Sequence, residues 1–171
     1  MKNLTELIKP SKEDLPSIYC DMDQVLCNFI GGAEQIIGLP FDQADKNERW
    51  GKIKQTKDFW ATLEWMPNAK KLYQFISRYD PKILSAYSDR DVNSRPGKIK
   101  WLGKNTKIKR NNINLVKRAD KQKFAVTDGK PNILIDDYMK NIIEWKAKGG
   151  IGVHHTNVSK TIGELKRLGF K

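Results

Sequence analysis

Cysteine and long apolar runs are scarce in this sequence of 171 residues. Cys20 and Cys27 are too few for a disulfide scaffold, and no Cys and His at metal-ligand spacing surround them. We therefore expect both to be small buried residues of a protein in a reducing, cytoplasmic setting. No apolar run approaches the ~18–20 residues of a membrane span. The polar start, residues 1–16, lacks the apolar segment of a signal peptide.

Acidic residues are also in deficit. The sequence has 32 Lys and Arg against 20 Asp and Glu, which gives a net charge of +12. Eleven of the basic residues fall in segment 97–130, where only two Asp oppose them. Such a segment favours an anionic partner, because it can steer phosphorylated small molecules or contact a nucleic-acid backbone. A solvated surface of helix and loop is the alternative interpretation.

Short apolar runs alternate with stretches of helical periodicity through most of the chain. The runs predict strands at residues 16–20, 82–85, 113–116, 132–135 and 151–154. The periodic stretches predict helices over residues 67–79, 95–104, 139–147 and 162–168. This alternation is typical of an α/β fold, in which helices flank a parallel sheet.

The segment between the first two predicted strands is less regular. Residues 25–37 could start a helix, but Gly31 and Gly32 interrupt the pattern. Residues 38–65 are polar and irregular, although they contain several large aromatic side chains. These are Phe41, Trp50, Phe59, Trp60 and Trp65. We interpret the segment as an insertion with its own small apolar cluster.

Polar side chains follow three of the predicted strands. Asp21 and Asp23 come after the first strand, Ser85 ends the second, and Asp136 and Asp137 end a later one. Ligands of open α/β sheets bind beyond the carboxyl ends of the strands, so we expect these groups to meet there. Several carboxylates gathered at one edge imply a cation, and Mg²⁺ suits oxygen ligands and phosphate substrates. A serine and a lysine would donate hydrogen bonds to phosphate oxygens, which indicates a phosphoryl-transfer site.

These residues can have a catalytic role or an ordinary structural one. Asp21 and Asp23 point to the same side of an extended segment, so one can attack phosphorus while the other transfers protons. Asp137 could instead cap the following helix while Asp136 binds the metal. His154 and His155 lack acidic or Cys partners at ligand spacing, which favours a structural role.

Four motifs in order resemble the haloacid dehalogenase (HAD) superfamily of phosphatases. They are DMDQVL at 21–26, ILSA at 83–86, a lysine near 121 and ILIDDY at 133–138. Within it the chain is most similar to the 5′(3′)-deoxyribonucleotidase family, through MPNA at 66–69 and LIDD at 134–137. The resemblance covers residues 17–157. It implies an HAD-like core domain, residues 1–28 and 66–171, with a small helical cap, residues 29–65, inserted after the first strand.

The resemblance also implies roles for individual residues. Asp21 would be the nucleophile and an Mg²⁺ ligand, and Asp23 the general acid and base, with its backbone carbonyl on the metal. Asp136 would complete the metal site, and Asp137 would ligate the metal through water or orient that water. Ser85 would hold the phosphoryl group and Lys121 would neutralise charge, although the spacing also permits Lys123. Gln24 departs from the family, which usually has glycine at this position.

The implied activity is Mg²⁺-dependent hydrolysis of a phosphate monoester, in particular a nucleoside monophosphate, by a chain that can dimerise as related nucleotidases often do. Phe29, Phe59 and Trp60, with Trp65, could line a base-binding pocket, because aromatic rings stack on nucleobases. Their alternative role is the cap's own core. Two other functions stay open: a phosphatase for phosphorylated nucleic-acid ends, which segment 97–130 would contact, and a non-catalytic nucleic-acid-binding module on the same scaffold.

Overall fold

A parallel sheet forms the centre of the computed structural model, which describes residues 11–171. Residues 1–10, most of the polar start, lie outside the described part. Five parallel strands are arranged in the order β3-β2-β1-β6-β7. Their bounds are β1 (Ile18–Cys20), β2 (Lys82–Ala86), β3 (Ile113–Val116), β6 (Ile133–Asp136) and β7 (Ile151–His154). All five strands predicted from the sequence are confirmed.

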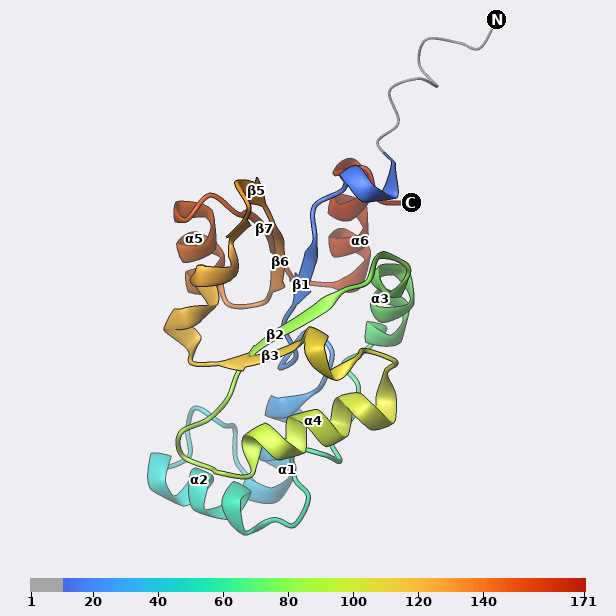
Figure 1. Cartoon of the computed structure of the whole chain (residues 1–171). Coiled ribbons are helices and arrows are strands. Elements are labelled where there is room, and N and C mark those ends of the chain that lie inside the picture. The colour runs from blue at the N-terminus through green and yellow to red at the C-terminus, as the bar shows by residue number, and fades with distance from the viewer. Residues whose placement is uncertain (1–10) are drawn as a thin grey trace, which may run out of the picture.

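Helices cover both faces of this sheet (Figure 1). On one side lie α3 (Ala69–Ile76), α4 (Ser94–Asn105) and α6 (Val158–Arg167), and on the other α5 (Met139–Ala147) and the 3-10 helix η5 (Arg118–Phe124). Short 3-10 turns are η2 (Lys12–Asp14), η3 (Ser77–Tyr79) and η4 (Arg110–Asn112), and β4 (Val126–Thr127) pairs with β5 (Lys130–Pro131) as a small hairpin. Among residues 11–171, no helix has the length and apolarity needed to cross a membrane.

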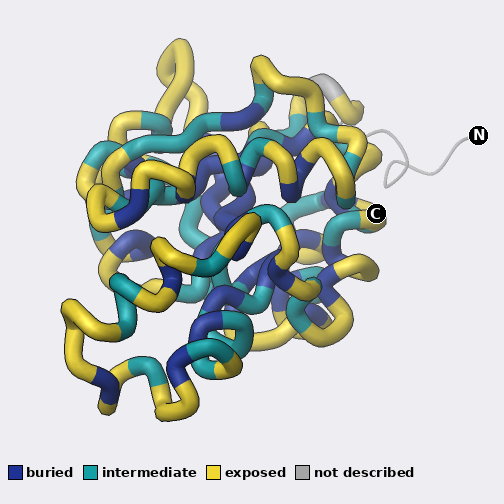
Figure 2. Tube along the Cα trace, turned by 90° about the horizontal axis from the view of Figure 1, so that it is seen from below, coloured by how far each residue is buried: buried dark blue, intermediate teal, exposed yellow. Residues whose placement is uncertain are grey.

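Alternation along the strands explains the two layers, because successive side chains of a strand point to opposite faces. Ile18, Ile83 and Ile133 belong to the larger apolar cluster, which includes residues of α3, α4 and α6. Their successors in sequence, Tyr19, Leu84 and Leu134, pack with residues of α5. Figure 2 shows the buried segments gathered inside the molecule and the exposed ones outside. The expectation for the cysteines is confirmed, since both are free and buried.

The segment between β1 and β2 contains two helices, α1 (Phe29–Ile37) and α2 (Lys46–Gln55). The predicted interruption at Gly31 and Gly32 is wrong, because α1 runs through both glycines. A Cβ atom on Gly32 would lie 2.5 Å from the Leu63 side chain, so glycine here permits close packing. The expectation of irregular structure over residues 38–65 is also wrong for α2.

Helix α2 escaped notice because its sequence, KNERWGKIKQ, is polar and buries only Ile53. Its beginning is set locally, since the Asp45 side chain accepts hydrogen bonds from the backbone N–H groups of Asn47 and Glu48. Apolar residues of segment 29–65 belong to the same cluster as those beneath the sheet. The division into a core domain and a cap with the stated bounds stays a prediction.

The loop after β1 is tied to α1 by the side chain of Gln24. This residue has a φ of 63°, a left-handed conformation that favours glycine. Its Oε1 accepts a hydrogen bond of 2.9 Å from the N–H of Ile30, in the first turn of α1. Gln24 therefore replaces the conformational freedom of glycine with a side-chain contact between the loop and the helix.

We expect Gln24→Ala to lower the free energy of unfolding by about 1 kcal/mol, because the hydrogen bond from Ile30 is lost while the backbone strain remains. Gln24→Gly should be close to the wild type, since relief of the strain offsets the lost hydrogen bond. Urea unfolding of both variants measures this, with the exposed Gln35→Ala on α1 as the control. A Gln24→Gly variant less stable than Gln24→Ala would contradict the strain argument.

Candidate active site

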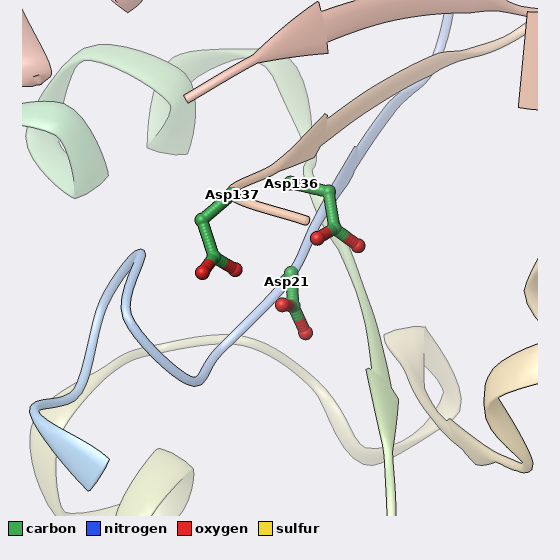
Figure 3. Close-up of side chains that lie close together, drawn as sticks. All are labelled: Asp21, Asp136 and Asp137. Atoms are coloured by element: carbon green, nitrogen blue, oxygen red, sulfur yellow. The ribbon is translucent and has the colours of Figure 1, made fainter. Parts of the chain in front are cut away.

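Three carboxylates converge at the carboxyl edge of the sheet, as the strand ends predict. Asp21 follows β1 and Asp136 ends the neighbouring strand β6, with the N–H of Asp21 donating to the carbonyl of Ile135 at 2.9 Å. Asp137 is next along the chain, and Figure 3 shows the three side chains facing a common space. One carboxylate oxygen from each lies within 4.8 Å of the others.

Lys121 neutralises two of these carboxylates. Its Nζ lies 3.1 Å from Asp21 Oδ1 and 2.7 Å from Asp136 Oδ2, and the side chain is 4% exposed. Burial alone lowers the pKa of Lys121, but the two carboxylates outweigh it and the pKa is raised. Lys123 is exposed and pairs with Asp120. Of the two lysines that the sequence left open, the structure places Lys121 in the site.

Asp136 is fully buried and has several partners. Its Oδ2 also accepts from the Asn141 amide at 3.0 Å, and its Oδ1 accepts from the N–H of Tyr138 at 2.9 Å. Burial and the charge of Asp21 raise the pKa of Asp136, against the opposing effect of Lys121. The hypothesis that Asp137 caps α5 is wrong, because Asp136 makes the bond at the start of that helix and no side chain caps its N-cap position.

Asp137 is half-buried and makes no ion pair with a residue in the range 11–171. Burial, followed by the charges of Asp21 and Asp136, raises the pKa of Asp137 to about 7. A nitrogen of the His154 ring lies 2.9 Å from the Asp137 carbonyl oxygen. His155 is buried and bonds the Thr161 hydroxyl, which gives it a structural contact within the fold.

Lys98, from α4, completes the site and was missed in the sequence. Its buried Nζ donates to Asp23 Oδ2 at 2.8 Å, to Ser85 Oγ at 2.9 Å and to the carbonyl of Ala86 at 2.9 Å. These three bonds use all the donors of the ammonium group. Lys98 thus joins the strand-end serine to the second aspartate of the DMD motif.

The sequence does contain a periodic pattern that indicates the burial of Lys98. The buried residues of α4 are Ser94, Lys98, Trp101 and Leu102, which lie three or four positions apart on one helix face. A lysine on the buried face of a helix needs a partner for its charge. Because segment 97–130 contains many lysines, the sequence alone did not distinguish Lys98 from the lysines that face solvent.

The aromatic residues predicted to bind a base pack on one another in the structure. Phe29 and Trp60 stack with ring centroids 5.1 Å apart, Phe59 meets both edge-on, and all three are buried. The Nζ of Lys98 lies 5.4 Å from the centroid of the Trp60 ring. Phe59 and Trp60 also line a cleft of about 240 Å³ whose other lining residues include three lysines. Trp65 packs elsewhere, against Trp101 and Tyr73.

Trp60 is held against the start of α4 by two contacts. Its indole N–H donates to the buried carboxylate of Asp91 at 2.7 Å. A Cβ atom on Gly97 would lie 2.4 Å from the Cβ of Trp60, so glycine is required for this approach. The aromatic cluster is thereby fixed beside the helix turn that carries Lys98.

The charge of the site fits one divalent cation. When Asp21, Asp23, Asp136 and Asp137 are all ionised, they supply four negative charges, and Lys98 and Lys121 offset two of them, which leaves two for a cation. Carboxylate oxygens are the hard ligands that Mg²⁺ prefers. The side chains brought together are those of Asp21, Asp136 and Asp137. The carboxylate of Asp23 is turned to Lys98, and ligation through its backbone carbonyl stays a prediction.

Comparisons with known proteins show which solved structures have a similar fold. No protein-family model matches the sequence, and no curated protein matches it. The chain is similar in structure to a hydrolase from Pseudomonas syringae, with a TM-score of 0.50, 18% identity, and coverage of 91% of this chain and 90% of that one. A hydrolase from Streptococcus pneumoniae TIGR4 matches with a TM-score of 0.52, 10% identity, and coverage of 89% and 98%. At these identities the likeness concerns the fold alone, and with the sheet topology it confirms the predicted α/β fold class, a parallel sheet flanked by helices.

The raised pKa of Asp137 predicts a pH-dependent stability in metal-free protein. Between about pH 4 and about pH 7 the folded state binds more protons at this group than the unfolded state, so stability falls as pH rises. Asp137→Asn should therefore raise the melting temperature more at pH 8 than at pH 5. Thermal unfolding in EDTA measures the difference, with the exposed Asp42→Asn as the control. An equal shift at both pH values would contradict the prediction.

Proposed function

We propose that this protein is a Mg²⁺-dependent phosphatase that hydrolyses phosphate monoesters through a phosphorylated aspartate. One observation carries the proposal: at the carboxyl edge of the sheet, buried Lys121 binds Asp21 and Asp136, and buried Lys98 binds Asp23 and Ser85. The resemblance of the motifs to HAD phosphatases and the two hydrolase structures of the same fold support it.

In the first step, a carboxylate oxygen of Asp21 attacks phosphorus, and the bond from phosphorus to the ester oxygen breaks. The leaving oxygen takes a proton from the carboxyl group of Asp23. Ser85 would donate a hydrogen bond to an oxygen of the transferring group, Lys98 would hold Ser85 and Asp23 in place, and Lys121 would offset charge beside Asp21. Because Lys98 already contacts both Asp23 and Ser85, it links the phosphate position to the proton donor.

In the second step, water attacks the phosphorus of the phospho-Asp21 group. Asp23, now a carboxylate, takes the proton of that water. The bond from phosphorus to Asp21 breaks, which releases inorganic phosphate and restores both aspartates. Mg²⁺ held by Asp21, Asp136 and Asp137 would supply positive charge that lets an anionic substrate approach these carboxylates.

A nucleoside monophosphate is the substrate class that we propose. The motifs at 66–69 and 134–137 resemble those of deoxyribonucleotidases, and the stacked pair of Phe29 and Trp60 lies beside Lys98. A base could reach these rings only after the cluster rearranges, since both are buried here. Hydrolysis of phosphorylated oligonucleotide ends is the competing substrate class.

Asp21→Asn should abolish phosphate release, by about 10³-fold or more, while leaving the fold intact, because the amide cannot form the covalent intermediate. The assay follows phosphate release from dUMP and dTMP with Mg²⁺ and with EDTA, and Asp42→Asn is the control. Undiminished turnover by Asp21→Asn would refute the assignment. Faster release from a 5′- or 3′-phosphorylated oligonucleotide than from either mononucleotide would overturn the substrate class.

Lys98→Met should lower kcat by about 10²-fold, because Ser85 and Asp23 lose the cation that orients them. Lys100→Met, two positions along α4, is the matched control, since the Lys100 side chain is 69% exposed. Steady-state kinetics on the mononucleotide compare the two variants, with circular dichroism to verify their folding. Equal kcat values in the folded variants would exclude a role for Lys98 in the reaction.

A further inference from the structure

A groove of about 710 Å³ lies at the amino edge of the sheet, opposite the carboxylates. Asp80 and Pro81, directly before β2, and Asn112, directly before β3, form one part of its lining. Tyr73 and Gln74 of α3, Ser77 and the stretch from Lys104 to Lys109 form the rest. In Figure 1, α3 and the carboxyl end of α4 lie on the side of the molecule away from α5.

The lining contains three basic residues that the active site does not use. Lys98 and Lys121 enter the site, while Arg118 pairs with Glu144 at 2.9 Å. By contrast, four neighbouring cations are exposed and make no ion pair with any residue in the range 11–171. They are Lys104, Lys107, Lys109 and Arg110, of which the three lysines line the groove and Arg110 flanks it.

One of these cations has an ordinary structural explanation. Lys104 lies in the last turn of α4, where a positive charge favours the helix dipole. Lys107, Lys109 and Arg110 lie beyond the helix, so the dipole does not explain them. Asp80 is the one acidic residue of the lining, and its Oδ1 already accepts from the Asn112 amide at 2.9 Å.

The backbone that carries the cations is anchored to the fold. The N–H of Lys107 donates to the Tyr73 hydroxyl at 2.8 Å, and the N–H of Thr106 donates to the carbonyl of Leu102 at 2.8 Å. The lysines are therefore carried by anchored backbone, and the lining of the groove also includes Tyr73 and the half-buried Ile108.

We propose that this groove binds single-stranded nucleic acid. The ammonium groups of the lining lysines would contact successive backbone phosphates, and binding would release the counterions condensed on those phosphates. The ring of Tyr73 and the amide of Gln74 would meet bases, which are accessible in a single strand and stacked away in a duplex. Because the groove is at the opposite edge from Asp21, it would tether the protein to the strand independently of the proposed phosphatase chemistry.

Fluorescence anisotropy of a labelled oligothymidylate tests the proposal in the whole protein, whether or not phosphatase activity is found. For the wild type, three to four phosphate contacts predict a slope of log K against log salt concentration of about −2 to −3. The triple variant Lys104→Gln, Lys107→Gln, Lys109→Gln should bind about tenfold or more weakly at low salt, with a slope smaller by about 2.

The matched control is Lys140→Gln, Lys160→Gln, Lys166→Gln, which removes the same charge from exposed positions on α5 and α6. It should keep the wild-type slope and bind within about threefold of the wild type. Equal weakening of both triple variants would overturn the groove assignment, as would absence of binding by the wild type at low salt. Tighter binding of duplex DNA, or displacement of the strand by polyglutamate at equal charge, would overturn the choice of a single strand.

Discussion

Two buried ammonium groups offset the repulsion between the carboxylates at the carboxyl edge of this sheet. Parallel strands β1 and β6 end side by side, so Asp21 and Asp136 are forced together by the sheet itself. Like charges at this separation disfavour ionisation, and Lys121 between them offsets that cost with two short ion pairs. The position of η5 follows from this need, since it must deliver Lys121 to the edge. Arg118 of the same 3-10 helix bonds Asn141, which in turn bonds Asp136.

The second lysine couples the site to the segment between β1 and β2. Lys98 contacts Asp23 and Ser85 on one side and lies over the Trp60 ring on the other. Trp60 is itself fixed by its hydrogen bond to Asp91 and by its close approach to Gly97. Gln24 adds a further tie, from the loop of the two aspartates to α1. The geometry of Asp23, the proposed acid and base, therefore depends on packing outside the sheet. For this reason we expect substrate access to require movement of these aromatic residues.

The excess of positive charge has more than one structural basis. Lys98 and Lys121 are buried among carboxylates, and Arg118 and Lys123 are paired with acidic neighbours. The exposed cations at 104–110 surround a groove at the opposite edge of the sheet. Basic residues that are close in sequence thus lie at opposite edges of the sheet. Helix α4 leads from the carboxyl edge to the groove, and β3 returns the chain to the carboxyl edge, where η5 begins.

The sequence by itself determined the five strands of the main sheet, most helices and the strand-end polar residues, because these depend on local periodicity and on apolar runs that end at a polar residue. Helix α2 was missed, since its sequence is polar and its start depends on the Asp45 cap. Only the tertiary structure decided which lysines enter the site. Lys98 and Lys100 are two residues apart on one helix, yet one is buried between Asp23 and Ser85 and the other faces solvent. That difference arises from which helix face packs on the sheet, and it depends on contacts between residues far apart in the chain.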